Sequence, residues 1–491
     1  MSNKHSSDDR LTIFSFLLAA AVIFHLGKWN VWLQSPVSLA LGAAAVSVLL
    51  KPSSTRRLYA LLVIIVIDVF EKMPWIPNHW LFAMIVSLTV LSSAFIVLIQ
   101  SRRISAGARP LYDTFAPALR LELLLLYFFA FFHKLNYDWF DPEVSCGALL
   151  FSSSFHLPVF PGHRFLSEIL PIYGTLILEA SIPLFLIFKR LRIAGIILAL
   201  VFHFILGTFE YYNFSAFTYA FLFLFVPDNF PDRLREWWNG SAVHRHYARL
   251  ASADSTRRSR APGLIIAGAA CLLLFIYARM YYPALEPHIG IRDPMKLGKP
   301  RLYYAFLGLW WIYGLSLIYI FLLVLRRGEP SKYKEAGFFF PANAVLMIFP
   351  LLVIINGASP YLGFKTQTTW SMFSNLRTEG GYSNHILVRH PYYIAGYQTD
   401  LVEIRRSTDP VLGVFQQSGY LIPYFELRRY ISRKRPSYPN GEPLIYIRKG
   451  KEFTVSSPDA YPELFKPINY FLRKLLTFRP VPSGARGPCQ H

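Results

Sequence analysis

The 491-residue sequence is poor in charge. Charged residues make up 16% of the chain, whereas hydrophobic residues make up 54%. A soluble protein of this length needs more charge to cover its surface, so the composition excludes an ordinary soluble protein and indicates a membrane protein. The formal net charge is +21, but the basic residues stand in short stretches between apolar runs. This pattern excludes a continuous nucleic-acid-binding face and indicates loops next to a lipid bilayer.

Cysteine is also scarce. Cys146, Cys271 and Cys489 form neither a paired framework nor a metal-binding spacing, and the disulfide status of Cys146 and Cys489 stays open. The sequence has no glycine-rich phosphate loop, no metal-spaced histidine or cysteine set, no serine triad signature and no internal repeat. We therefore expect no metal site, and any chemistry has to come from other side chains.

Long apolar runs, by contrast, are abundant. About eleven are long enough, or nearly so, for a helix of about 20 residues that crosses a bilayer. The predicted fold class is an all-α polytopic membrane helical bundle with a small C-terminal α+β domain. The runs fall at 11–27, 36–50, 58–71, 79–99, 116–134, 166–188, 193–209, 214–227, 263–282, 303–325 and 340–357.

Short basic clusters alternate with these runs. If all eleven runs span the membrane, every cluster lies on the same side, and basic loops are typical of the cytoplasmic side. The pattern predicts a multi-pass protein of the plasma or inner membrane with a cytoplasmic N-terminus and an exoplasmic C-terminal domain. The clusters are Lys51 with Arg56 and Arg57, Arg102 with Arg103 and Arg109, Lys189 with Arg190 and Arg192, Arg233 to Arg260, and Arg326 with Arg327, Lys332 and Lys334.

The sequence changes character after Gly357, where charge rises and apolar residues begin to alternate with polar ones. We predict a transmembrane domain over 1–357, an exoplasmic domain over 358–479 and a disordered tail over 480–491. Within the second domain, we predict strands at 383–389, 401–405 and 444–448 and helices at 411–434 and 462–477.

Candidate site residues cluster where an aromatic run ends, in the segment FFHKLNYDWFDPEVSC over 131–146. A lysine at the end of a span commonly reaches for lipid head groups, which is one interpretation of Lys134. The aromatic and acidic residues that follow, Asp138 and Trp139 among them, favour a pocket that partly buries the amine next to His133. Burial disfavours the ammonium form and can yield a neutral amine that acts as a base.

Other ionisable residues stand within or beside the predicted spans. Glu179 and His203 lie inside spans and His79 opens one, and each is either a paired structural group or part of a function. We expect His79 to line one outward-facing cavity together with Asp68, Glu71, Lys134 and Glu210.

A second polar constellation, WSMFSNLRTEGGYSNH, covers 370–385 and includes Trp370 and Arg377. The pattern favours a surface that binds a polar group or closes over the membrane mouth. The glycine pair at 380–381 is also typical of a hairpin turn.

Three motifs resemble the vitamin K-dependent gamma-carboxylase family and its bacterial relatives, the horizontally transferred transmembrane (HTTM) domain proteins. The segment KLNYDW over 134–139 resembles a segment of that family, and it is the most specific of the three motifs. Phe202-His203 followed by Phe214 to Phe217 resembles a later family helix, and Trp370-Ser371-Met372 resembles the motif that follows the last membrane helix. The resemblance covers 11–385.

The resemblance implies a lyase that couples oxidation of a reduced quinone, vitamin K hydroquinone or a similar quinol, to carboxylation of glutamyl residues with O₂ and CO₂ as co-substrates. It places the base on Lys134, with His133 where animal enzymes often carry a second lysine, and with His203 nearby as a further catalytic candidate. Asp138, Trp139, Glu179, His79, Trp370 and Arg377 are the candidate substrate-binding residues. It also implies a glutamyl protein or peptide substrate on the exoplasmic side.

A different class of function stays open. The chain is then a transporter that uses Glu179 and His203 as a proton relay, or a scaffold whose outer domain binds a partner. A transporter of the common type shows inverted repeats and interrupted helices, and the sequence shows neither.

Overall fold

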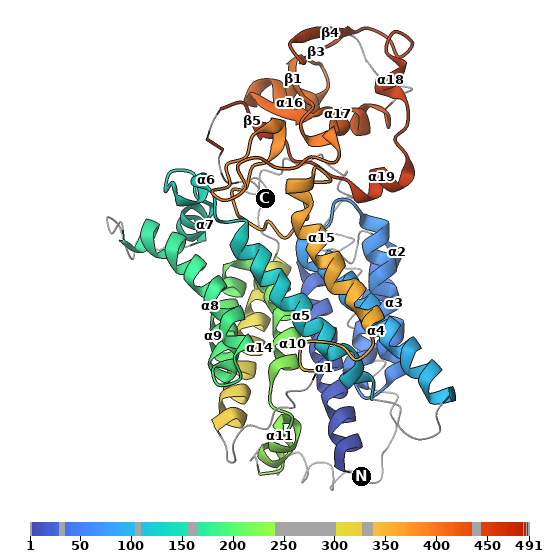
Figure 1. The fold of residues 1–491 in the computed structure, drawn as a ribbon, viewed down its shortest axis with the longest axis vertical. Helices are drawn as coiled ribbons and strands as arrows, with labels where there is room; N and C mark the ends of the chain where they lie inside the picture. The colour runs from blue at the N-terminus through green and yellow to red at the C-terminus, as the bar shows by residue number, and fades with distance from the viewer. Residues whose placement is uncertain are drawn as a thin grey trace.

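A computed structural model gives the fold (Figure 1). It describes residues 2–28, 35–103, 110–154, 165–240, 301–326, 337–434, 443–484, 486–487 and 489.

The described residues are mostly helical up to residue 362. The helices before that point are α1 (Ser2–Gly27), α2 (Pro36–Leu50), α3 (Thr55–Lys72), α4 (Asn78–Arg103), α5 (Leu111–Phe132), α6 (Tyr137–Phe140), α7 (Cys146–Ser154), the π-helix η2 (Phe165–Gly174), α8 (Thr175–Ile187), α9 (Arg192–Leu206), η3 (Gly207–Tyr211), α10 (Tyr212–Leu222), η4 (Phe223–Phe225), α11 (Phe230–Asn239), α14 (Arg301–Arg326), η5 (Ala344–Met347) and α15 (Ile348–Leu362).

Within the described ranges, seven helical stretches are long and apolar enough to cross a membrane. They are Asp9–Gly27, Asn78–Ser101, Leu111–Phe132, Phe165–Ile187, Arg192–Phe225, Ala305–Arg326 and Ala344–Leu362. The chain therefore has the architecture of an integral membrane protein.

This set differs from the eleven predicted runs for identifiable reasons. The runs at 193–209 and 214–227 form one apolar stretch, Arg192–Phe225, which is kinked at Phe209 and at Glu210, where φ is +78°. The run at 36–50 is a shorter apolar helix, and the run at 58–71 lies in α3, whose ends are charged. The run at 263–282 lies outside the described residues.

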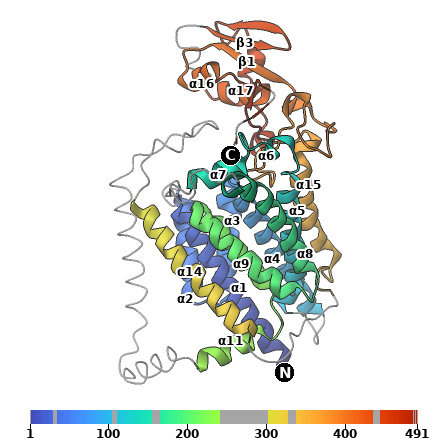
Figure 2. The ribbon, with the colours of Figure 1, turned by 90° about the vertical axis from the view of Figure 1, so that its left-hand side faces the viewer.

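The helices pack around α1, which contacts α2 and α10 on its flanks. α5 packs against α4, α8 and α15, and α9 packs against α8, α10 and α14 (Figure 2). Buried apolar side chains from these helices form one continuous core. This arrangement brings the end of α5, with Lys134, next to α8 and α15.

The C-terminal part of the chain forms a five-stranded sheet in the order β4-β3-β1-β2-β5, in which every neighbouring pair is antiparallel. Its elements are η6 (Glu379–Gly381), η7 (Gly396–Gln398), β1 (Leu401–Arg406), α16 (Pro410–Ser418), β2 (Tyr420–Pro423), α17 (Tyr424–Ile431), β3 (Leu444–Arg448), β4 (Lys451–Val455), α18 (Pro462–Phe465), α19 (Tyr470–Leu475) and β5 (Val481–Pro482).

The strands predicted at 401–405 and 444–448 are confirmed as β1 and β3. The single helix predicted over 411–434 is wrong. Gly419, with φ of +69°, ends α16, and β2 follows before α17 begins. The segment 383–389 is not a strand, and His385 forms only an isolated bridge with Asn136. A turn over Glu379–Gly381 takes the place of the hairpin considered for the glycine pair.

The composition of residues 480–491 predicts disorder, but part of this segment is anchored. Val481 and Pro482 form β5 and pair with β2. Cys489 forms a disulfide with Cys146 across a sequence separation of 343 residues. The two cysteines lie too far apart in the sequence to show as a spaced pair, so only the fold reveals the bond.

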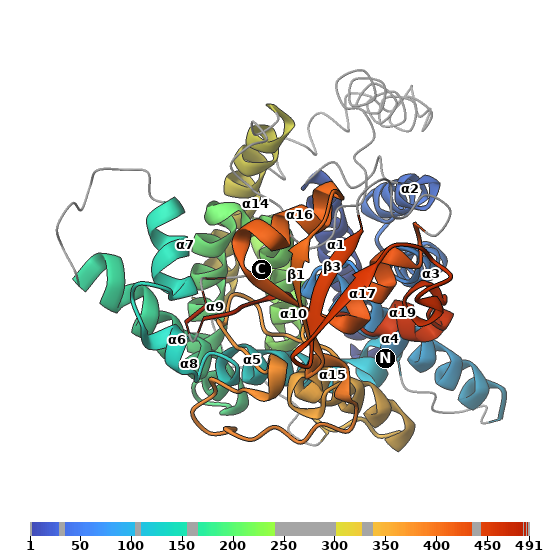
Figure 3. The same ribbon diagram turned by 90° about the horizontal axis from the view of Figure 1, so that it is seen from above.

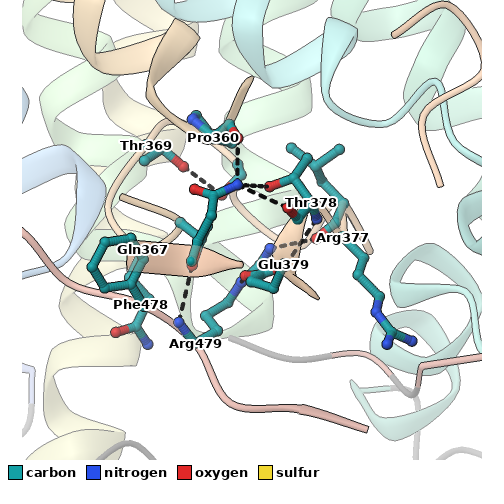
Figure 4. Close-up of polar contacts among 12 residues, drawn as sticks. Pro360, Gln367, Thr369, Arg377, Thr378, Glu379, Phe478 and Arg479 are labelled. Carbon is teal, nitrogen blue, oxygen red and sulfur yellow. Dashed lines mark hydrogen bonds and ion pairs between the residues drawn. The ribbon is translucent and has the colours of Figure 1, made fainter. Parts of the chain in front are cut away.

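The junction between α15 and the C-terminal region is a buried polar network (Figure 4). Gln398 Nε2 donates to the carbonyl oxygens of Pro360 and Thr378, each at 2.8 Å. The side chain of Arg479 forms an ion pair with Glu379 at 3.3 Å. The bond to Pro360 fixes the C-terminal region against the last turn of α15, and the other two contacts join segments within the C-terminal region. Buried polar groups are costly to leave unpaired, so each of these contacts matters for stability.

Candidate functional site

Lys134 lies just beyond the end of α5 and is 4% exposed. Its ammonium donates to the carbonyl oxygen of Ala130 at 3.0 Å and to Glu179 Oε1 at 2.9 Å, with Oε2 2.8 Å away. The indole of Trp139 lies 5.4 Å from the amine. The amine is thus buried among protein groups, which argues against the interpretation that it reaches for lipid head groups.

Glu179 comes from the middle of α8 and is also buried. It interacts electrostatically with Tyr127, which precedes Lys134 by seven residues on α5. A spacing of seven residues places two side chains on the same helix face. The Tyr127 hydroxyl is hydrogen-bonded to His203 Nε2 at 2.7 Å. Lys134, Glu179, Tyr127 and His203 therefore form one polar row between α5, α8 and α9.

Trp139 forms a wall of this site. Asn136 caps the short helix α6 by accepting from the backbone N–H of Trp139 at 2.9 Å. The indole N–H donates to the carbonyl of Ile172 at 3.3 Å, and the ring packs with Cys146 and Leu176. A side chain at Gly147 would meet the indole at 3.1 Å, so glycine lets α7 approach the ring closely.

His133 belongs to a different environment. Its Nε2 lies 3.0 Å from the carbonyl oxygen of Gly357 on α15, and its ring lies against Tyr361. Trp370 lies on the same side, and its indole donates to the carbonyl of Val353 at 2.8 Å. These contacts fasten α5 to α15 and to the segment after it, and they do not bring His133 to the Lys134 amine.

Asp138 and Arg377 form a third group outside the helical bundle. Asp138 Oδ2 accepts from Asn384 Nδ2 at 3.0 Å, and burial raises the pKa of its carboxyl group. Arg377 acts electrostatically on Asp138 and donates to the carbonyl of Gly484. Asn384 also donates to the carbonyl of Asn375 at 2.8 Å. The group links the loop after Lys134 to the C-terminal region.

His79 lies in a second polar cluster of the bundle. Its Nε2 lies 3.0 Å from His25 Nδ1, and the ring of His25 stacks on Trp80 with a centroid separation of 3.7 Å. The ring of Phe214 lies against both His79 and His203, so an apolar side chain separates this cluster from the Lys134 row. These contacts do not bring His79 next to the Lys134 amine, and one cavity lined by both residues stays a prediction.

Two members of these clusters were not among the predicted site residues. Tyr127 carries a detectable signal, namely its spacing of seven residues from Lys134. The only sequence signal for His25 is its position near the end of the first apolar run. Its pairing with His79 depends on how α1 packs against α4.

An amine, a carboxylate and an aromatic wall stand together in an apolar bundle. Among the described residues, no group of three or more His, Cys, Asp or Glu side chains is arranged to hold a metal ion.

Comparisons with family models, with curated proteins and with solved structures found no match to this chain.

Proposed function

We propose that this chain is a membrane enzyme in which Lys134 removes a proton from a lipid-soluble phenol of the quinol class. The observation that carries the proposal is the buried Lys134–Glu179 pair beside Trp139. The resemblance of KLNYDW to the gamma-carboxylase family supports the same residue. In that family, the reduced quinone supplies, with oxygen, the strong base that drives carboxylation.

A lysine acts as a base only after it has lost its own proton. Glu179 Oε1 accepts a hydrogen bond from Lys134 at 2.9 Å, which is the direct route for that proton. Glu179 therefore serves as the acceptor of the Lys134 proton, and this transfer leaves the amine neutral.

Tyr127 and His203 extend the same row. Their hydrogen bond of 2.7 Å gives Glu179 a neighbouring pair through which a proton can leave the site. Trp139 orients the amine and screens it from water. Carboxylation of a glutamyl protein is a further part of this proposal, and it rests on the resemblance alone.

Lys28 provides a matched control for testing Lys134. Both lysines are buried, donate to a backbone carbonyl and face an aromatic ring, Tyr211 in the case of Lys28. Purified native protein, Lys134→Met and Lys28→Met are assayed for quinol oxidation, with and without labelled CO₂ and glutamyl peptides. We expect Lys134→Met to lose at least about a hundredfold in rate, the usual scale for a lost general base.

Lys28→Met should keep most of the activity. Equal rates for the native protein and Lys134→Met would contradict the catalytic role of Lys134. If the native protein has no activity, the row of Glu179, Tyr127 and His203 is better assigned to proton-coupled transport. That alternative is measured as a pH change inside liposomes that contain the protein.

We also propose that the C-terminal region lies on the exoplasmic side. It stands at one end of the bundle, whereas the N-terminus and α11 stand at the other (Figure 1). The Cys146–Cys489 disulfide supports this placement, because disulfides persist in oxidising compartments.

A further inference from the structure

The helix α19 is unusually exposed for a helix rich in apolar residues. None of its residues is buried, and Phe471 is 62% and Leu475 50% exposed. Tyr470 and Leu472 are also exposed. Contiguous apolar surface of this kind marks a place where a protein or a membrane binds.

α19 lies against the end of α3 (Figure 3). Lys474 donates to the carbonyl oxygens of Phe70 and Glu71 at 2.9 and 2.7 Å, and so satisfies free carbonyls in the last turn of α3. The rings of Phe70 and Tyr470 have centroids 6.4 Å apart. The two helices are therefore joined at a defined contact.

The exposed surface of α19 continues along α3. Val63, Ile67 and Phe70 are all exposed, and their spacing of four and three residues places them on one helix face. This face ends where Tyr470 begins. A single apolar surface thus runs along α3 and onto α19.

Positive charge borders this surface. Arg433, Arg473 and Lys474 lie close enough to interact, and burial together with Arg473 lowers the pKa of both Arg433 and Lys474. Two carboxylates act electrostatically on these cations, Glu426 on Arg433 and Glu71 on Lys474. Both are already engaged, Glu426 by Arg429 at 2.8 Å and Glu71 by Ser35 at 3.0 Å. In the described part of the chain, Arg433 and Arg473 have no carboxylate in ion-pair contact.

We propose that Arg433 and Arg473 bind the anionic head group of a phospholipid whose acyl chains lie along the exposed face of α3, with α19 in the membrane interface. Both parts of such a lipid, the head group and the acyl chains, meet side chains of matching chemistry. Arginine recognises phosphate with its planar fork of donors, and the apolar stripe accepts hydrocarbon. Tyr470 lies between the arginines and the apolar face of α3. Aromatic side chains of this kind gather at the interface between the lipid head groups and the hydrocarbon.

Lipid binding tests the proposal directly. Full-length protein in detergent is titrated with phosphatidylglycerol, with phosphatidylcholine and with inorganic phosphate, and bound molecules are counted by native mass spectrometry. The test variant is Arg433→Gln with Arg473→Gln. The control is Lys449→Gln with Lys451→Gln, which removes the same charge from the exposed β3–β4 turn at the far end of the domain (Figure 1).

We expect the native protein and the control to prefer phosphatidylglycerol over phosphatidylcholine. The test variant should lose roughly tenfold to thirtyfold in affinity for phosphatidylglycerol, because each cation near a membrane contributes about a factor of five. Arg433→Lys with Arg473→Lys should keep part of the preference, which separates lost charge from lost folding.

Three results would overturn the proposal. The native protein binds both lipids equally, or the test variant retains the full preference, or inorganic phosphate displaces phosphatidylglycerol at equal concentration. The last result would assign the cations to a soluble phosphate group and not to a lipid.

Discussion

Lys134 and His133 are neighbours in the chain, but their side chains leave the end of α5 in different directions. Successive residues on a helix are about 100° apart, so one of the pair faces α8 and the other faces α15. Lys134 meets Glu179, and His133 meets the Gly357 carbonyl. The division separates a candidate base from a structural contact, although both residues are catalytic candidates in the sequence.

Lys365 gives a pH-dependent prediction at the scale of one residue. It lines a small cavity with Met73, Ile76 and Thr477, and burial lowers its pKa from 10.5 to about 7. Below pH 7 the amine is protonated in both the folded and the unfolded state, so the folded state bears the cost of desolvating the charge. Between pH 7 and about 10.5 the unfolded state binds more protons, so the free energy of unfolding rises with pH.

Lys365→Met removes this dependence. We expect the variant to unfold at a higher denaturant concentration than the native protein at pH 6, with the gain shrinking toward pH 10. Lys466→Met, at an exposed position, serves as the control. A gain of the same size at both pH values would show that the effect comes from packing and not from the titration of Lys365.

At the scale of elements, close packing depends on a glycine inside a helix. The sequence predicts that the last span ends at Gly357, but α15 continues to Leu362 and ends where Gly363 adopts φ of +77°. A side chain at Gly357 would meet the ring of Phe129 at 2.4 Å. Gly357 therefore does not end the helix. It lets α5 and α15 approach closely enough for His133 to reach the carbonyl oxygen of Gly357.

Gly357→Ala tests this packing. We expect a loss of about 1–3 kcal/mol in the free energy of unfolding, because the extra methyl group forces the two helices apart. Gly308→Ala in α14 is the matched control, since nothing lies within 4 Å of its added methyl group. Alanine favours helix over glycine, so the control should be neutral or slightly stabilising. Unfolding in denaturant is measured for both, and equal effects would contradict the packing role of Gly357.

The whole molecule is a helical bundle with a small sheet domain fastened to one end. The hydrogen bond from Gln398 to the Pro360 carbonyl holds the domain to α15, and the disulfide joins Cys489 to α7. A third contact comes from Lys474 at the end of α3. Three attachments at separate places give the domain a fixed position over the end of the bundle that holds Lys134.

Labelling of single cysteines tests the orientation of the molecule. Lys451→Cys lies on the exposed edge of β4, and Lys51→Cys lies at the C-terminal end of α2, next to the start of α3 and away from the domain. Both are made in a Cys271→Ser background. A membrane-impermeant maleimide added to intact cells should label Lys451→Cys and leave Lys51→Cys unlabelled until the cells are opened. The reverse pattern would place the C-terminal domain in the cytoplasm.

The sequence by itself determined the membrane class, most of the apolar helices, the strands β1 and β3, and Lys134 as the leading candidate residue. These depend on composition and on short-range periodicity, which every segment carries in its own residues. Only the tertiary structure decided that Glu179 and not Asp138 faces Lys134, that His133 and His79 belong to other clusters, and that Cys146 is bonded to Cys489. Such pairings join residues far apart in the chain, and they follow from how the helices rotate and pack against one another, which no local pattern specifies.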